Sequence, residues 1–142
     1  MLDYKVGEIM GNRKLVIYFH LIWSTQDSVP WISSDIERPI YRCIVNQIQK
    51  LSCEVLAING VPDHVHVVVK LRSTTSVASL VKQAKGISSK FINDQLNFGG
   101  EFRWSSGYGA FTISRWDLAM IINYVKKQKI HHSDGSVFEE LE

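Results

Sequence analysis

The sequence predicts an α+β domain with a ferredoxin-like antiparallel sheet, helices on one face of that sheet, and an extra C-terminal helix. The first observation is the order of the periodic segments, which runs strand–helix–strand–strand–helix–strand–helix. The second is size, because 142 residues are about one domain's worth. The third is composition, since 45% apolar and 21% charged residues are typical of a globular chain with one core.

The first half of the chain supplies three strands and one helix. Residues 14–25 are rich in β-branched and aromatic side chains and are apolar on both faces, which predicts a central strand. A helix is expected over 35–51, where isoleucines recur at helical spacing. Strands are expected over 53–61 and 64–71, and the Pro62-Asp63 pair between them predicts a hairpin turn.

The second half supplies two helices and the last strand. A helix is expected over 77–95, with Thr75-Ser76 available as its cap. A strand is expected over 108–113, and the capping box Ser114–Asp117 then opens a final helix over 115–129. The apolar stripe of the first of these helices is expected to contain Val77, Leu80, Val81, Ala84, Ile87 and Phe91.

Charge is distributed unevenly along the chain. Residues 1–69 hold six basic and seven acidic groups, whereas residues 70–132 hold ten basic and three acidic groups. A basic second half indicates a polyanionic partner, with a solvated lysine face as the alternative. We divide the chain into an N-terminal arm over 1–13, a domain over 14–132 and an acidic tail over 133–142.

The sequence indicates neither a membrane-spanning nor an exported protein. No apolar stretch approaches the ~20 residues of a membrane span, and the first residues lack the apolar core of a signal peptide. Cys43 and Cys53 have no further sulfur ligand for a zinc site, so we expect buried thiols in a reducing compartment. The expectation is a soluble cytoplasmic protein without a membrane partner.

His64 and His66 begin the strand expected over 64–71. Side chains alternate along a strand, so both imidazoles share one face while Val65, Val67 and Val69 share the other. The valines are expected in the core beneath the helices, which leaves the histidines on an open face, ~6–7 Å apart. Two imidazoles at this spacing can converge on one metal ion, although a structural role is the usual one for a single strand histidine.

Tyr124 and Gln128 lie one turn apart on the final helix, beside its apolar stripe. An edge tyrosine is commonly a packing residue with a solvated hydroxyl. The three lysines at 126, 127 and 129 nevertheless give this face the groups that phosphate chemistry uses. A tyrosine nucleophile would need such help because its pKa is about 10.

These residues resemble the single-tyrosine HUH transposases of small insertion sequences, the IS200-like family. The resemblance spans about 14–132. The residues that carry it are His64-Val65-His66, Gly107-Tyr108-Gly109-Ala110-Phe111 and Tyr124-x-x-x-Gln128-x-x-His131-His132, supported by Phe19–Thr25 and Lys85–Ser89.

The resemblance implies a chemistry and a set of partners. His64, His66 and Gln128 would bind Mg²⁺ or Mn²⁺, and Tyr124 would cut single-stranded DNA to leave a 5′-phosphotyrosine and a free 3′-hydroxyl. The resemblance further implies a homodimer that recognises subterminal hairpins at the ends of the element. Asp63 could be an outer metal ligand, although an acid before a strand is usually a turn residue.

The remaining polar residues are expected to contact DNA or to have structural roles. The expected contacts to DNA phosphates are Lys82, Lys85, Lys90 and Lys127. His131 and His132 match the family pattern, but a helix C-terminus also favours histidines there. His20 is expected to be a buried, hydrogen-bonded histidine without a catalytic role.

Geometry also favours a site shared between two chains. Tyr124 is expected ~15 Å along a stiff helix from Ser114, with little freedom to reach the third strand of its own chain. Two alternatives to a mobile transposase stay open. One is a domesticated relative that cuts genomic repeat hairpins, and the other is a non-catalytic single-strand-binding module on the same fold.

Overall fold

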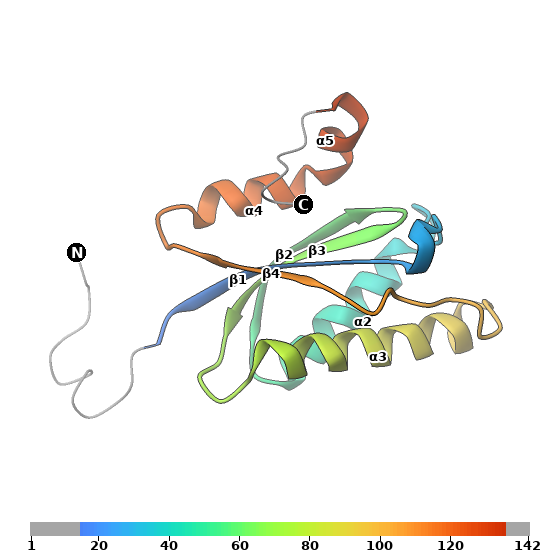
Figure 1. Ribbon diagram of the computed structural model, residues 1–142, viewed down its shortest axis with the longest axis horizontal. Coiled ribbons are helices and arrows are strands. Elements are labelled where there is room, and N and C mark those ends of the chain that lie inside the picture. Colours follow the sequence, from blue (N-terminus) through green and yellow to red (C-terminus); the bar gives the residue numbers. More distant parts are fainter. Residues whose placement is uncertain (1–14, 136–142) are drawn as a thin grey trace, which may run out of the picture.

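The computed structural model describes residues 15–135, which form a four-stranded antiparallel sheet with helices on both faces (Figure 1). The strands lie in the order β2-β3-β1-β4, so the predicted α+β class and the central place of the first strand are confirmed. The predicted arm over 1–13 and the end of the predicted tail lie outside the described residues. The strands are β1 (Ile17–Ser24), β2 (Glu54–Val61), β3 (His64–Leu71) and β4 (Gly109–Ile113). The helices are the short 3₁₀ helix η1 (Gln26–Ser28), α2 (Glu37–Lys50), α3 (Val77–Gln95), α4 (Leu118–Lys126) and α5 (Gln128–Asp134).

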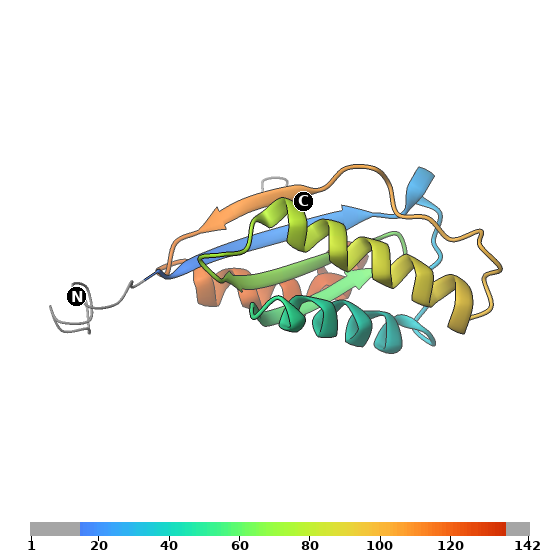
Figure 2. The same ribbon diagram turned by 90° about the horizontal axis from the view of Figure 1, so that it is seen from below.

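The main core lies between the sheet and the pair α2 and α3 (Figure 2). Val65, Val67 and Val69 of β3 are fully buried there, as the alternation of the strand predicts. From the central strand, Leu21 and Trp23 join them. Full burial of a side chain of this size contributes about 1.5–3 kcal/mol, so this layer holds the sheet in its register.

Of two predictions made for α3, its N-terminal cap is confirmed and its apolar stripe is partly wrong. Ser76 caps the helix as predicted, because its side-chain oxygen accepts a hydrogen bond from the backbone N–H of Ser79. The predicted apolar stripe is wrong at Ile87, which is 43% exposed. Ser88 and Ile92 are buried on α3 instead, because the buried face of this long helix drifts by one residue along its length.

The predicted final helix over 115–129 is wrong as one continuous element. Residues 115–117 form turns, α4 begins at Leu118, and α5 begins at Gln128. The break falls at Lys127, whose N–H contacts the carbonyls of Asn123 and Tyr124 as the last turn of α4 tightens. The two short helices can therefore point in different directions over the sheet.

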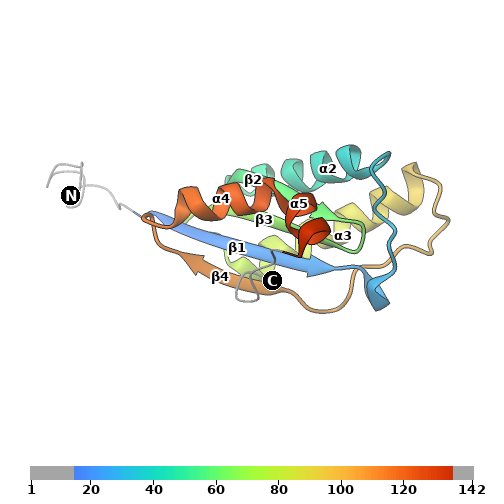
Figure 3. The same cartoon turned by 90° about the horizontal axis from the view of Figure 1, so that it is seen from above.

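The face of the sheet that carries the histidines is not open, contrary to the expectation from alternation alone. The helices α4 and α5 lie over β2 and β3 on this face, while β1 and β4 lie beside them (Figure 3). The reason is a second apolar cluster that the sheet offers to α4. Its buried members are Ala57, Val68, Ile113, Ile121 and Val125.

The two cysteines are buried to different degrees. Cys53 is buried and Cys43 is half-buried, and both are free thiols. Burial raises the pKa of the Cys43 thiol, which makes it a poor nucleophile. Within residues 15–135, no helix is both long enough and apolar enough to cross a membrane.

Candidate active site

Three histidines from two distant parts of the chain converge on the covered face of the sheet. His64 and His66 come from β3, and His132 comes from α5. One ring nitrogen of each lies within 4.8 Å of those of the other two. The ring centroid of His64 lies 5.2 Å from that of His66 and 4.8 Å from that of His132. Strand alternation correctly predicts the first pair, whereas the third member depends on how α5 docks.

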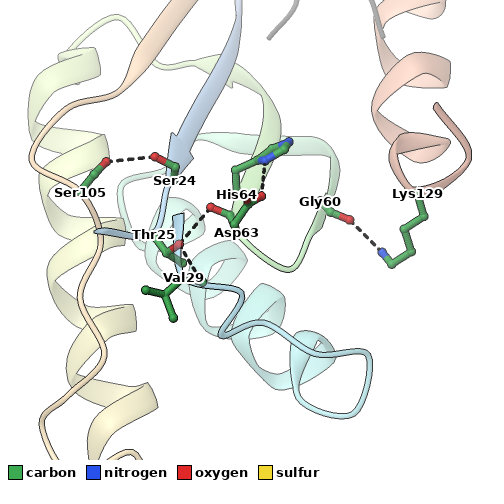
Figure 4. A network of polar contacts seen from close by, with 8 residues as sticks. All are labelled: Ser24, Thr25, Val29, Gly60, Asp63, His64, Ser105 and Lys129. Carbon is green, nitrogen blue, oxygen red and sulfur yellow. Dashed lines mark hydrogen bonds and ion pairs between the residues drawn. The ribbon is translucent and has the colours of Figure 1, made fainter. Parts of the chain in front are cut away.

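The hairpin between β2 and β3 fixes the orientation of His64. The ring nitrogen Nδ1 of His64 lies 2.8 Å from Oδ1 of Asp63 (Figure 4). The backbone carbonyl of Asp63 accepts hydrogen bonds from the N–H and the hydroxyl of Thr25, which ties this turn to the end of β1. On the neighbouring strand, Gly60 lies so close that an added Cβ would clash with the carbonyl oxygen of His64. Asp63 is thus the hydrogen-bonding partner of His64.

Tyr124 lies against the same cluster and is only 2% exposed. Its ring centroid lies 6.3 Å from that of His66, and the ring stacks on His131 at 4.5 Å. The expectation that Tyr124 has little freedom to reach the third strand of its own chain is therefore wrong. The turns at 115–117 redirect the chain, and α4 then runs back across the sheet instead of projecting from it.

Gln128 is fully buried at the first position of α5. It precedes His132 by four residues, so the two side chains lie one helical turn apart on the same side of α5. The structure thus buries the predicted amide ligand on the helix that delivers the third imidazole.

A polar clamp holds the junction of α4 and α5 on the edge of the sheet. The side-chain N–H of Asn59 donates to the carbonyl of Lys126, 2.9 Å away, and so caps the end of α4. The amine of Lys129 donates to Asn59 Oδ1 at 2.6 Å. It also donates to the carbonyl of Gly60 at 3.1 Å (Figure 4). The same amine forms a 2.9 Å ion pair with Glu37 of α2. These contacts anchor the helix pair that carries the tyrosine and His132.

The lysines predicted to contact DNA are not equivalent. Lys85 donates hydrogen bonds to the carbonyls of Ser105 and Gly107, and partial burial lowers the pKa of its amine. Lys90 forms a 3.3 Å ion pair with Asp94, whereas Lys82 and Lys127 are exposed. Three of the four lie on α3, across the sheet from the histidines. The structure therefore does not bring this set together with the cluster.

A groove of about 450 Å³ adjoins His64 on the uncovered half of the face. Its wall includes the loop that Lys85 holds, and the hydroxyls of two lining residues, Ser24 and Ser105, lie 3.2 Å apart (Figure 4). Tyr108 and the neighbouring Phe111 of β4 are 43% and 42% exposed. The groove residues are Ile22, Trp23, Ser24, His64, Ser105, Gly107, Tyr108 and Gly109.

The donor set fits a divalent metal ion. Three imidazoles with donor nitrogens within 4.8 Å of one another offer the nitrogen ligands that divalent transition metals accept. The sequence predicted His64 and His66 as metal ligands and left His132 open between the family pattern and a helix end. It also predicted a buried, hydrogen-bonded His20, and this is confirmed by its contact with His66.

Comparison with known proteins identifies the family and the fold of this chain. The family model described as "Transposase IS200 like" matches residues 14–128. A candidate transposase from Deinococcus radiodurans R1 has a similar fold, with a TM-score of 0.63 and 22% identity over 90% of this chain and 98% of that one. A REP-associated tyrosine transposase, solved bound to a REP hairpin, gives a TM-score of 0.65 and 12% identity over 93% and 74% of the two chains. No curated protein matches the sequence. Because the family model covers most of the chain, the resemblance found in the sequence is confirmed, and this chain belongs to the IS200-like transposase family.

Proposed function

We propose that this chain is a metal-dependent DNA transposase that cleaves and rejoins single-stranded DNA at the ends of an insertion sequence. The observation that carries the proposal is the placement of Tyr124 beside His66, with ring centroids 6.3 Å apart in one chain. A phenol next to clustered imidazoles combines a nucleophile with ligands for a cation that stabilises phosphoryl charge. Membership of the transposase family supports DNA as the substrate.

His64 and His66 would hold a divalent cation, with Gln128 as a further ligand and Asp63 in an outer position against His64. His132 is an additional candidate, because its donor nitrogen lies within 4.8 Å of those of both strand histidines. When bound, Mg²⁺ or Mn²⁺ would polarise the scissile phosphate and stabilise its developing charge. We expect Mn²⁺ to bind more tightly, because imidazole nitrogen suits it better than it suits Mg²⁺.

Tyr124 would supply the nucleophilic oxygen. A bond forms between the phenolic oxygen and phosphorus while the bond from phosphorus to the 3′-oxygen breaks. The phenolic proton is lost and the departing 3′-oxygen gains a proton, which leaves a 5′-phosphotyrosine and a free 3′-hydroxyl. Attack by the 3′-hydroxyl of another strand end rejoins the DNA without ATP. Burial and the stack on His131 restrict the ring, which favours one direction of attack.

The groove beside His64 is the proposed path of the single strand near the cut. The exposed ring of Tyr108 in this groove could stack on an unpaired base. Hairpins at the element ends are proposed to contact the exposed amines of Lys82, Lys90 and Lys127, with Lys85 acting through the loop that it holds. That one structural neighbour was solved with a REP hairpin supports this class of partner.

We further propose that the active unit is a homodimer, since a two-fold dimer is the commonest closed assembly. Tyr124 and His66 lie together within one chain, so the dimer is not needed to bring this pair together. Mixing Tyr124→Phe with His64→Ala under subunit exchange tests for shared sites. Restored cleavage indicates that tyrosine and metal site can come from different chains, and no restoration indicates that each chain uses its own.

The decisive experiment measures a covalent protein–DNA adduct. The protein is incubated with Mn²⁺ and single-stranded element-end DNA carrying a label at either its 5′ or its 3′ end. The expected adduct survives boiling in detergent and retains only the 3′ label, because the tyrosine keeps the 5′-phosphate of the downstream fragment. Tyr124→Phe should abolish the adduct and leave DNA binding within about threefold, since only one hydroxyl is lost.

Tyr41→Phe is the matched control for the loss of a phenol. Tyr41 lies on α2, and burial together with the adjacent Glu37 carboxylate raises the pKa of its hydroxyl well above the usual value. This phenol stays protonated and is a poor nucleophile, so the variant should form the adduct normally. An adduct that persists in Tyr124→Phe would place the nucleophile elsewhere.

The same assay separates the alternatives. A non-catalytic single-strand-binding module would bind the DNA and form no adduct with either label. A domesticated relative would form the adduct on repeat hairpins from the genome and would fail to join element ends to a target strand.

A further inference from the structure

Two buried histidines from neighbouring strands contact each other behind the cluster. His20 of β1 and His66 of β3 are both fully buried. Nε2 of His20 lies 2.7 Å from Nδ1 of His66, and the rings stack with centroids 4.9 Å apart. In the register of the two strands, His20 pairs with Val68 and His66 pairs with Ile22, so the histidines are diagonal neighbours on one face. His20 itself is not a member of the three-histidine cluster.

If His66 acts as a metal ligand, the positions of the ring protons decide which of the two histidines donates this hydrogen bond. Because Nδ1 of His66 is engaged with His20, Nε2 is the nitrogen through which His66 can bind a metal. A neutral imidazole that coordinates through Nε2 carries its proton on Nδ1. His66 must then donate this hydrogen bond, and Nε2 of His20 must accept it. The remaining proton of a neutral His20 is consequently on its own Nδ1.

His64 provides a comparison within the same site. Its Nδ1 also has a partner, Oδ1 of Asp63 at 2.8 Å, so both strand histidines direct the same nitrogen toward a supporting group. The two supports differ in kind. Asp63 is a carboxylate whose side chain is 38% exposed, whereas His20 is an imidazole with no exposed surface. Groups that hydrogen-bond to metal-ligating histidines orient the ring and fix its tautomer.

We propose that His20 is a positioning residue for the metal site, which holds His66 in the Nδ1–H tautomer with Nε2 directed into the cluster. This inference rests on the metal-binding part of the proposed function. His20 acts only through His66, and touches neither the DNA nor the tyrosine in this assignment. His20 is fully buried, and a neutral imidazole avoids the cost of desolvating a carboxylate at this position.

The test compares two substitutions at this position. His20→Gln keeps an acceptor, since its amide oxygen can receive the hydrogen bond from His66. His20→Leu fills a similar space without any acceptor. Leu21→Val, on the opposite face of the same strand and equally buried, controls for general loss of stability. Mn²⁺ binding without DNA is measured from the electron paramagnetic resonance signal of the free ion, and thermal unfolding verifies that each variant is folded.

We expect His20→Leu to weaken Mn²⁺ binding by about 10- to 100-fold, the usual effect of losing such a partner. His20→Gln should recover most of the affinity, and Leu21→Val should bind as the wild type does. Equal Mn²⁺ affinity in folded His20→Leu and wild type would overturn the inference while leaving the metal site intact. A wild type that binds no Mn²⁺ would instead contradict the proposed metal site, and the inference with it.

Nuclear magnetic resonance of the ring nitrogens gives a second readout that needs neither metal nor a stable leucine variant. In the wild type, His66 should show the pattern of the Nδ1–H tautomer. In His20→Gln, that pattern should persist. A wild-type His66 protonated on Nε2 would overturn the inference, because His66 would then accept the hydrogen bond from His20.

Discussion

Substitution of Val125 tests how firmly α4 and α5 are held on the sheet. Val125 is fully buried in the small cluster with Ala57, Val68, Ile113 and Ile121. Val125→Ala removes the equivalent of two methylene groups, worth about 0.8 kcal/mol each, and leaves a cavity that adds to the loss. We expect a total cost of about 2–3 kcal/mol. The cluster and the polar clamp of Asn59 and Lys129 attach α4 and α5 to the sheet. The cost should therefore appear as local detachment of these helices and not as global unfolding.

Hydrogen exchange followed by mass spectrometry measures this detachment segment by segment. A cost of about 2 kcal/mol should raise exchange of the α4 and α5 amides about 30-fold. Exchange in α3 should stay close to that of the wild type. The matched control is Val67→Ala, which removes the same groups from a fully buried position on the opposite face of β3. The control should lower the unfolding temperature and leave exchange in α4 unchanged.

One result would refute this reasoning. If Val125→Ala raised exchange in α3 and α4 by the same factor, the helix pair and the sheet would unfold as one cooperative unit. The apolar cluster under α4 would then be an extension of the main core, and the helix pair could not detach independently.

Three further predictions follow from the contacts described above. His66→Ala should lower the free energy of unfolding by about 3 kcal/mol because a fully buried, hydrogen-bonded ring is lost, whereas His64→Ala should cost under about 1 kcal/mol, as chemical denaturation can measure. Asn59→Ala removes the hydrogen bond that caps α4, worth about 1 kcal/mol, and should slow adduct formation about fivefold in a time course. Lys82→Gln should reduce the slope of log binding constant against log salt concentration for single-stranded DNA by about 0.7. Lys85→Gln should leave this slope unchanged and lower the unfolding temperature, because the Lys85 amine donates to backbone carbonyls.

The sheet and the first two long helices were predictable because each has a strong local pattern. The alternation His64-Val65-His66-Val67 sets which side chains share a face, and the structure follows it along the whole of β3. The cap at Ser76 is an equally local signal. Such features depend on neighbours within a few residues, so the sequence alone contains them.

The covering of the histidine face was not predictable in the same way. Nothing in the Lys126–Lys129 segment breaks a helix, since lysine and glutamine are good helix formers and the segment contains neither Gly nor Pro. The break at Lys127 arises from tertiary contacts, chiefly the Asn59 bond to Lys126 and the docking of Val125. The place of His132 in the cluster depends on that break, so it too lay beyond local reasoning.

The separation of the cluster's members along the chain has a consequence for biosynthesis. His64 and His66 precede His132 by all of α3, β4 and α4. Synthesis runs from the N-terminus, so the strands β1 to β3 leave the ribosome well before α5 has been made. A nascent chain at that stage contains two of the imidazoles and lacks both Tyr124 and the third. Whatever chemistry the complete cluster performs is therefore withheld from nearby DNA until translation has passed α5.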